Sequence, residues 1–422
     1  MPKVPFTKEM KKDYTILIPN MSPIHFNVMK RPFELHGYRI ILLENSSHTV
    51  IEEGLKYVHN DMCYPALLVI GQMIDALHRG ICDPDKCALV ITQTGGGCRA
   101  SNYYFLLLKA LERAGYPQIP VISLNLQGMN SNPGFQITAS MIVQALSGLI
   151  YGDMLMMLSH QTRPYEVNKG DTDRMIAKWT DYIDSCFKQN RHYLGRWLKK
   201  NLYAMSDDFA SIPMDRTKAR VKVGVVGEIY LKYAPLGNNN LEDFLEGEGC
   251  EVMVPAMLGF VLYGFSNGIK DAEYYGRGKR YAFLMKHFGL PFLARYEHLL
   301  EKAISKNGFV PPATLKELQS YAEGIIDTGC KMGEGWLLTA EMVELIKKGY
   351  SNIITTQPFG CLPNHICAKG MIRPLKEKYP ESNIVPIDYD PSQSRVNQEN
   401  RIKLMLSVAR ERLDEEQRKE AR

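Results

Sequence analysis

The sequence predicts an α/β fold in which two parallel-sheet domains are joined by helices. Short apolar runs with strand character alternate with helical segments in both the first and the last third of the chain. Between these parts the pattern is helical, with no convincing strand. Alternation with short turns is typical of a mostly parallel sheet covered on both faces. We expect a first α/β domain at 1–133, a helical connection at 134–215, and a second α/β domain with a helical insertion and a C-terminal helix at 216–422.

Each expected element has a local signal. Ser22 precedes a helix that ends near Gly37, and the pair Thr49 and Glu52 has the spacing of a capping box. A single helix is expected over Asn364–Lys378. The expected strands are Thr15–Pro19, Tyr38–Leu43, Cys87–Thr92 and Val121–Leu126 in the first domain, and Val221–Val226, Glu251–Val254, Ile353–Thr356 and Ile384–Ile387 in the second.

Composition narrows the class of protein. The 422 residues are 45% hydrophobic and 23% charged, with a net charge of +5 that is small for this length. We therefore expect neither a nucleic-acid partner nor a membrane partner. The N-terminus lacks the apolar core of a signal peptide, so a cytoplasmic protein is expected. Nine cysteines, an odd number, favour free thiols or metal ligands over a disulfide framework.

Three of these cysteines are expected at one edge of the two sheets. Cys98 follows a strand and three glycines, Gly95 to Gly97, and opens a helix whose positive end should favour the thiolate. Cys361 repeats this order of strand, glycine, cysteine and helix. Cys63 opens the helix that precedes the Cys98 strand. Because strand-to-helix turns of parallel sheets lie at the carboxyl edge, the three sulfurs are expected there together.

The other cysteines are less suited to this place. Cys82 and Cys87 have a metal-like spacing, but they precede the strand and should lie at its amino edge. Cys186 and Cys250 fall within helical or strand patterns and are expected to pack as small apolar side chains. The positions of Cys330 and Cys367 stay open.

Three thiolates without an obvious fourth ligand suit a cubane iron–sulfur cluster with one open iron better than a structural zinc site. Each cysteine taken alone is at least as well explained as a buried core thiol. The glycines could instead form a phosphate-binding turn, but the rest of a nucleotide-binding motif is missing.

Four segments carry a resemblance to a known family. NDMCYPALLVIGQ, ITQTGGGCRASNYY, VVGEIYLKYAPLGNNNLEDFL and TTQPFGCLPNHICAKGMIRPL resemble the 2-hydroxyacyl-CoA dehydratase and benzoyl-CoA reductase family. The similarity is greatest to the C-terminal portion of the acyl-CoA dehydratase activase-related proteins and runs from about Tyr14 to Ala409. The resemblance implies two flavodoxin-like domains with a helical part. It also implies a 4Fe–4S cluster held by Cys63, Cys98 and Cys361.

The resemblance further implies a reaction. A separate ATP-hydrolysing iron–sulfur activator would supply one low-potential electron in trans, and the cluster would pass it to an acyl-CoA thioester or another small substrate. The resulting ketyl radical would lose a β-hydroxyl group. Members of the family act as dimers, so a dimer is expected. A related group carries a double-cubane cluster, for which Cys330 and Cys367 are the only plausible additional ligands.

Five further residues are candidates for substrate contact because they flank the expected centre: Ser22, His25, Arg99, Asn364 and His365. Each has a plainer explanation, such as a helix cap for Ser22 or a surface charge for Arg99. Two other classes of function stay open. The chain could be a non-catalytic iron–sulfur electron carrier, or a metal-free α/β enzyme that binds a phosphate at the glycine turn.

Overall fold

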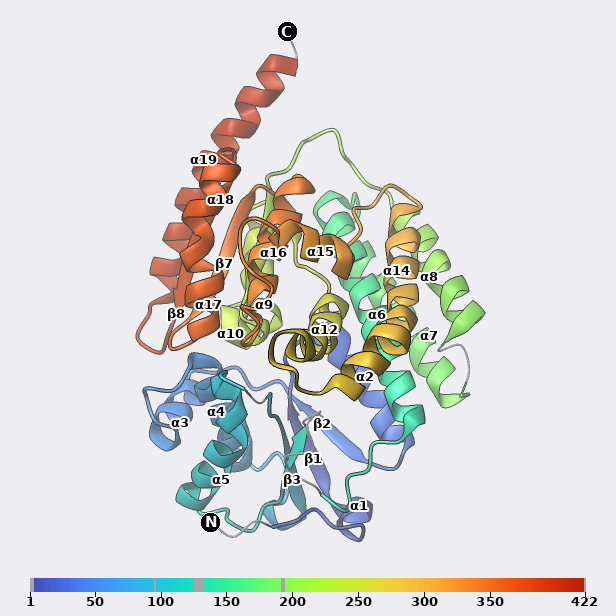
Figure 1. The fold of residues 1–422 in the computed structure, drawn as a ribbon, viewed down its shortest axis with the longest axis vertical. Coiled ribbons are helices and arrows are strands. Elements are labelled where there is room, and N and C mark those ends of the chain that lie inside the picture. The colour runs from blue at the N-terminus through green and yellow to red at the C-terminus, as the bar shows by residue number, and fades with distance from the viewer. Residues whose placement is uncertain (1–3, 95, 125–131, 191–193, 421–422) are drawn as a thin grey trace.

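The computed structural model describes residues 4–94, 96–124, 132–190 and 194–420 and contains two four-stranded parallel sheets. The order is β2-β1-β3-β4 in the first sheet and β6-β5-β7-β8 in the second, so each sheet repeats the order 2-1-3-4. In Figure 1 the first sheet lies at the bottom and the second at the upper left. The strands are β1 Thr15–Pro19, β2 Arg39–Leu43, β3 Cys87–Thr92, β4 Val121–Leu124, β5 Lys222–Gly227, β6 Glu251–Met253, β7 Asn352–Pro358 and β8 Asn383–Tyr389.

Two glycines allow two helices of the first domain to pack closely against each other. Gly54 of α3 (Thr49–Tyr57) and Gly71 of α4 (Tyr64–His78) face each other, and a Cβ at Gly71 would lie 2.1 Å from the Val50 carbonyl oxygen. The two backbones therefore touch, which only glycine permits. Because α4 is buried along nearly its whole length, its first residues are held firmly where the two sheets meet. The remaining helices of this domain are α1 Met10–Asp13, α2 Pro23–Leu35 and α5 Tyr103–Ala114.

The middle of the chain is helical, as predicted. The long apolar helix α6 (Ala139–Thr162) packs against helix α2 of the first domain and strand β6 of the second. The stretch Ala139–Tyr165 is long and apolar enough to cross a membrane, but 78% of its apolar window is buried inside the protein, as in the core helix of a soluble protein. Helices α7 (Asp171–Lys188) and α8 (Gly195–Ala210) lie beside it in Figure 1.

The second domain carries an insertion between β6 and β7, and it is made of helices. Figure 1 shows α12 and α14 in front of α6, and α19 running along β8 until its C-terminal end projects beyond the body. The α-helices of the whole second domain, including the insertion, are α9 Ile229–Tyr233, α10 Pro235–Asn238, α11 Leu241–Gly247, α12 Met257–Tyr275, α13 Lys279–Leu284, α14 Leu290–Ser305, α15 Leu315–Ala322, α16 Trp336–Lys347, α17 Leu362–Cys367, α18 Ile372–Lys378 and α19 Arg395–Glu420.

Two local expectations were wrong, and a third falls partly on undescribed residues. Thr49 and Glu52 form no capping box, because the Thr49 hydroxyl donates to Asp75 at 2.7 Å and Glu52 binds His48 at 3.1 Å. The single helix expected from Asn364 to Lys378 is divided into α17, a 3-10 turn and α18. The strand expected to reach Leu126 is seen to Leu124, and the next residues lie outside the described part of the chain.

Candidate metal centre

Each of the three predicted cysteines is the N-cap residue of a helix. Cys63 precedes α4, Cys361 precedes α17, and Cys98 precedes the 3-10 turn Arg99–Asn102 that leads into α5. None of the three sulfurs accepts a cap hydrogen bond, but in each case a backbone N–H of the following turn is near enough to lower the pKa of the thiol; these N–H groups belong to Ala66, Asn364 and Ala100, respectively. The three sulfurs thus lie at the ends of helices that start at the carboxyl edges of the sheets.

The three segments meet between the two domains. The Tyr64 N–H donates to the Phe359 carbonyl oxygen at 3.0 Å, which joins the start of α4 to the turn before Cys361. A Cβ at Gly360 (φ +73°) would lie 3.1 Å from the Cys63 Cα. A Cβ at Gly333 would lie 4.0 Å from the Cys98 sulfur and 2.9 Å from Pro363. The loop around Gly333 therefore separates Cys98 from the start of α17.

The sulfurs also interact electrostatically. A charge on Cys63 raises the pKa of Cys361, and a charge on Cys98 raises the pKa of Cys63, so each pair lies within Coulombic range. Within the described ranges, no group of three or more His, Cys, Asp or Glu side chains is arranged to hold a metal ion. The cysteines are neighbours whose side chains do not converge on a single point.

Burial dominates the acidity of these thiols. It raises the pKa of Cys63 to about 11 and raises the pKa values of Cys98 and Cys361 as well. For Cys98 the N–H of Ala100 opposes this shift without cancelling it. The expected effect of the helix start is thus present, but burial opposes it and raises the pKa of the Cys98 thiol overall.

A tyrosine hydroxyl binds one of the sulfurs. Tyr103, the first residue of α5, places its Oη 3.0 Å from the Cys63 Sγ, and both side chains are buried. Burial raises the pKa of Tyr103, and charges on Cys63 and Glu228 raise it further. The hydroxyl therefore keeps its proton and can donate it in a hydrogen bond to a deprotonated sulfur.

Two glutamates, half-buried Glu228 and buried Glu334, lie near the cysteines, and the sequence analysis did not identify them. Glu228 directly follows β5, and its Oε2 accepts the Leu231 N–H at 3.0 Å. Glu334 lies on the loop before α16, and its Oε1 accepts the Ile229 N–H at 3.0 Å. Burial raises the pKa of Glu228 to about 8, and the nearby Glu334 adds to the shift. Both glutamates contribute to the raised pKa values of Cys98 and Cys361, so they belong to the same site.

A buried ion pair lies close enough to Glu228 and Glu334 to affect their pKa values. Lys232 of α9 binds Glu341 of α16 at 2.8 Å, and both side chains are almost fully buried. The positive charge of Lys232 lowers the pKa values of Glu228 and Glu334, partly opposing their burial. The site thus contains two buried carboxyl groups, the half-buried carboxyl group of Glu228 and one buried cation.

Ser22 and His25 form part of an internal chain of hydrogen bonds. The Ser22 hydroxyl lies 2.7 Å from His25 Nδ1, and His25 Nε2 lies 3.0 Å from the Asp153 carboxylate. Asp153 also accepts the N–H groups of Met257 and Leu258 at 2.7 and 2.9 Å, at the start of α12. All three side chains are buried. The Ser22 side chain does not cap α2. Instead, these hydrogen bonds link the first domain, through Asp153 of α6, to the start of α12 in the insertion of the second domain.

The other three candidates flank the cysteines. Exposed Arg99 donates to the Asp61 carbonyl oxygen, which joins the Cys98 and Cys63 segments. Asn364 is fully buried and donates to the Thr356 carbonyl oxygen at 3.2 Å. His365 is exposed, and partial burial together with Lys369 lowers its pKa.

Several buried polar atoms near the carboxyl edge lack a partner within the described part of the chain. They are both amide atoms of Gln357, the Oδ1 of Asn364 and the hydroxyl of Tyr230. Buried polar groups are nearly always hydrogen-bonded in folded proteins. They lie near the ends of β5 and β7, so this edge can hydrogen-bond to water or to a polar ligand.

Four of the remaining cysteines lie where the sequence predicted them, and two had no predicted position. Cys82 and Cys87 are at the amino end of β3 and hydrogen-bond to each other, away from the centre. Cys186 and Cys250 are buried, as expected. Exposed Cys330 and buried Cys367 interact electrostatically, and Glu334 affects Cys367 as it does the cysteines of the centre.

The sequence matches no model of a known protein family, and no curated protein matches it.

Proposed function

We propose that the chain is a cytoplasmic iron–sulfur protein of the 2-hydroxyacyl-CoA dehydratase type. It takes a low-potential electron from an ATP-hydrolysing activator protein and passes it to an acyl-CoA or another small substrate. One observation carries this proposal: three cysteines from distant segments cap three helices at the junction of two parallel sheets. The order 2-1-3-4 in both sheets supports the flavodoxin-like identity of the domains, since flavodoxin-like sheets contain this order.

The residues at the junction fit a 4Fe–4S cluster held by Cys63, Cys98 and Cys361. A cluster binds each cysteine through a different iron, so its ligands need not converge on one point as the ligands of a single ion must. Every sulfur has a backbone N–H beside it, and Cys63 has the Tyr103 hydroxyl as well. Such hydrogen bonds compensate the negative charge of thiolates and tune a cluster.

When bound, the cluster would supply a low-potential one-electron centre with one iron free of cysteine. The chain's own residues would then do the rest. Tyr103 donates to the Cys63 sulfur, and the buried flank excludes water. Glu228 lies beside Glu334, and a raised pKa lets the pair hold a proton near neutral pH. The unpartnered amide of Gln357 can orient a polar substrate group.

A second candidate is a double-cubane reductase. Cys330 and Cys367 interact with each other, and Glu334 influences both Cys367 and Cys361. Two more thiols are thus available next to the proposed centre. An electron carrier without catalytic activity is the third candidate, and it would need no substrate beside the open iron.

Iron and sulfide counting after anaerobic purification tests the proposal. We expect about four irons and four sulfides per chain, lost in Cys63→Ala, Cys98→Ala and Cys361→Ala. Cys250→Ala is the matched control, because it removes a buried thiol away from the junction. About eight irons would favour the double cubane, and a colourless native protein would refute an iron–sulfur function.

A further inference from the structure

The insertion of the second domain exposes an unusually basic segment. Residues 274–296 contain five Lys or Arg and no Asp or Glu. All five cations are exposed: Arg277, Lys279, Arg280, Lys286 and Arg295. None of them forms an ion pair with any residue that the structure describes. Their charge is therefore available to an anionic partner.

The same segment exposes large apolar side chains. Seven of them are between 42% and 65% exposed: Tyr274, Tyr275, Tyr281, Phe283, Leu284, Phe288 and Phe292. Leu284, Phe288 and Phe292 line a cavity of about 600 Å³, and Arg295 lies at its wall. Contiguous apolar surface of this kind marks interaction sites, and a cavity can receive an anchoring side chain. We call the five cations and these seven residues the aromatic–basic face.

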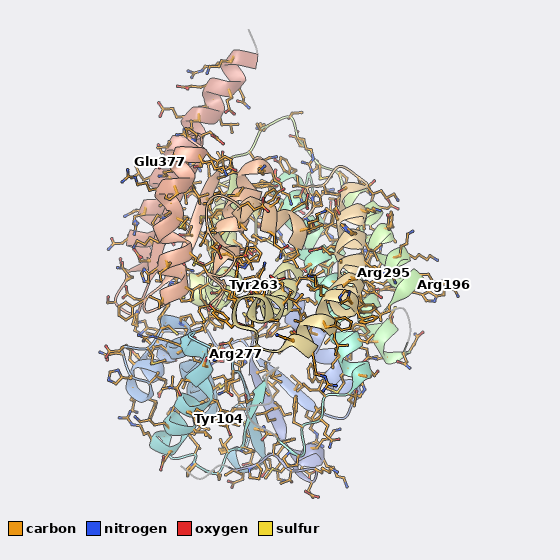
Figure 2. All side chains as sticks on the ribbon, viewed as in Figure 1. Tyr104, Arg196, Tyr263, Arg277, Arg295 and Glu377 are labelled. Carbon is orange, nitrogen blue, oxygen red and sulfur yellow. The ribbon has the colours of Figure 1, made fainter. Side chains whose placement is uncertain are left out.

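One loop connects this face to the cysteines. Lys331 binds Asp271 of α12 at 2.7 Å, and the Tyr274 hydroxyl donates to Asp327 at 3.4 Å. Farther along the loop, the Met332 sulfur accepts the Gly97 N–H at 3.3 Å. The residues between α12 and Cys98 are thus in continuous contact. Figure 2 shows Arg277 at the junction of the two domains, with Arg295 farther along the insertion.

Apolar exposure continues over the proposed centre itself. Met332, Phe359, Leu362 and Ile366 are each at least half exposed, although they surround buried cysteines. The loop from Asp327 to Met332 contacts both α12 and Gly97, so a protein seated at the Tyr275 end of the aromatic–basic face would lie beside the turn that carries Cys98. A redox protein bound in this position would lie close to the cysteines of the proposed centre.

We propose that the aromatic–basic face is the docking site of the electron donor, and that the donor is a protein with an acidic, partly apolar surface. This inference rests on the proposed function. A second copy of this chain fits less well, because two such faces would set cations against cations. The transfer is simple in its balance: the reduced donor loses one electron, and the centre of this chain gains it.

Reduced ferredoxin of the acidic 2(4Fe–4S) kind is the probe and stands in for the activator, because it too is an iron–sulfur protein that gives up one electron at low potential and its surface is acidic. The test variant is Arg277→Glu/Lys279→Glu/Arg280→Glu. The control, Arg196→Glu/Lys199→Glu/Lys200→Glu, changes the net charge equally on the exposed face of α8. Figure 2 shows Arg196 at the outer edge of the molecule, away from Arg277.

In stopped-flow mixing, we expect the second-order rate of reduction to fall at least about tenfold in the test variant and to be nearly unchanged in the control. Salt should slow the native reaction, because screening weakens long-range attraction. Dithionite should reduce all three proteins equally. Equal ferredoxin rates in the test variant and the control would overturn the docking site.

Binding of oxidised ferredoxin, measured by calorimetry at low salt, separates this inference from the proposed function. Weaker binding by the test variant supports the face even if the native protein holds no iron, whereas the proposed function would then fail. A native dimer that the test variant dissociates would assign the face to a second copy. Tighter binding of a single-stranded oligonucleotide than of ferredoxin would assign it to nucleic acid.

Discussion

The Tyr103 hydroxyl lies 3.0 Å from the Cys63 sulfur, and both groups are shielded from water. A hydrogen bond to a cluster sulfur stabilises the more negative, reduced state and raises the reduction potential. Tyr103 begins α5, and Cys63 precedes α4, so the packing of these helices sets the contact.

Tyr103→Phe should therefore keep the iron and lower the reduction potential of the protein. The measurement is an anaerobic redox titration followed by electron paramagnetic resonance. Tyr104→Phe is the control, because that ring lies one residue further along α5 and packs edge-on against Phe105. A potential that is the same in Tyr103→Phe and the native protein would show that the hydroxyl does not tune the centre.

Gly360→Ala should disturb the centre through the backbone. Gly360 has φ +73°, and an added Cβ would meet the Cys63 backbone at 3.1 Å. Gly349→Ala is a matched control, since Gly349 has φ +85° and open space around it. Both changes cost about 1–2 kcal/mol for the left-handed backbone. Only Gly360→Ala should also reduce the iron content, and equal iron in both variants would contradict the contact.

The positions of the strands could be predicted because their signals are local. Apolar runs between turn residues identified all eight strands to within a few residues, and the alternation with helices indicated parallel sheets. Cys98 and Cys361 followed from the same logic, since a residue in the turn after a strand lies at the carboxyl edge, and Cys63 followed because it opens the helix that precedes the Cys98 strand. That logic needs no knowledge of how the domains pack.

The rest of the site depends on tertiary contacts. Ser22 has the sequence of a helix cap, yet its hydroxyl binds His25, which is held in turn by Asp153 from a distant helix. Glu228 and Glu334 lie on separate segments and meet only when α9 packs against the loop before α16. A glutamate directly after a strand was a usable signal for Glu228, and an aspartate within an apolar helix was one for Asp153.

Asp153→Ala should destabilise the protein strongly. The carboxylate receives hydrogen bonds from His25 and from two backbone N–H groups of α12, and all are buried. Removing it leaves these donors unpaired, which we expect to lower the free energy of unfolding by about 3 kcal/mol or more. Ser22→Ala should cost only about 1 kcal/mol, because it ends the same chain of hydrogen bonds. Urea unfolding compares the two, and equal losses would contradict the central role of Asp153.

Glu297 of α14 should make stability depend on pH. Burial raises the pKa of Glu297 from 4.5 to about 7, although the Leu315 N–H donates to its carboxylate at 2.7 Å. The folded protein thus holds this proton more tightly than the unfolded chain does. Between pH 4.5 and 7 the unfolded chain loses the proton first, so the contribution of Glu297 to stability falls as the pH rises through this window.

Glu297→Gln removes the charge and keeps an oxygen that can accept the Leu315 N–H. Compared with the native protein, it should gain stability as the pH rises from 5 to 8, by up to about 3 kcal/mol. Urea unfolding at several pH values measures the difference, and Glu112→Gln, at an exposed position of α5, is the control. If the difference between Glu297→Gln and the native protein does not change with pH, the buried carboxyl group titrates as it does in the unfolded chain.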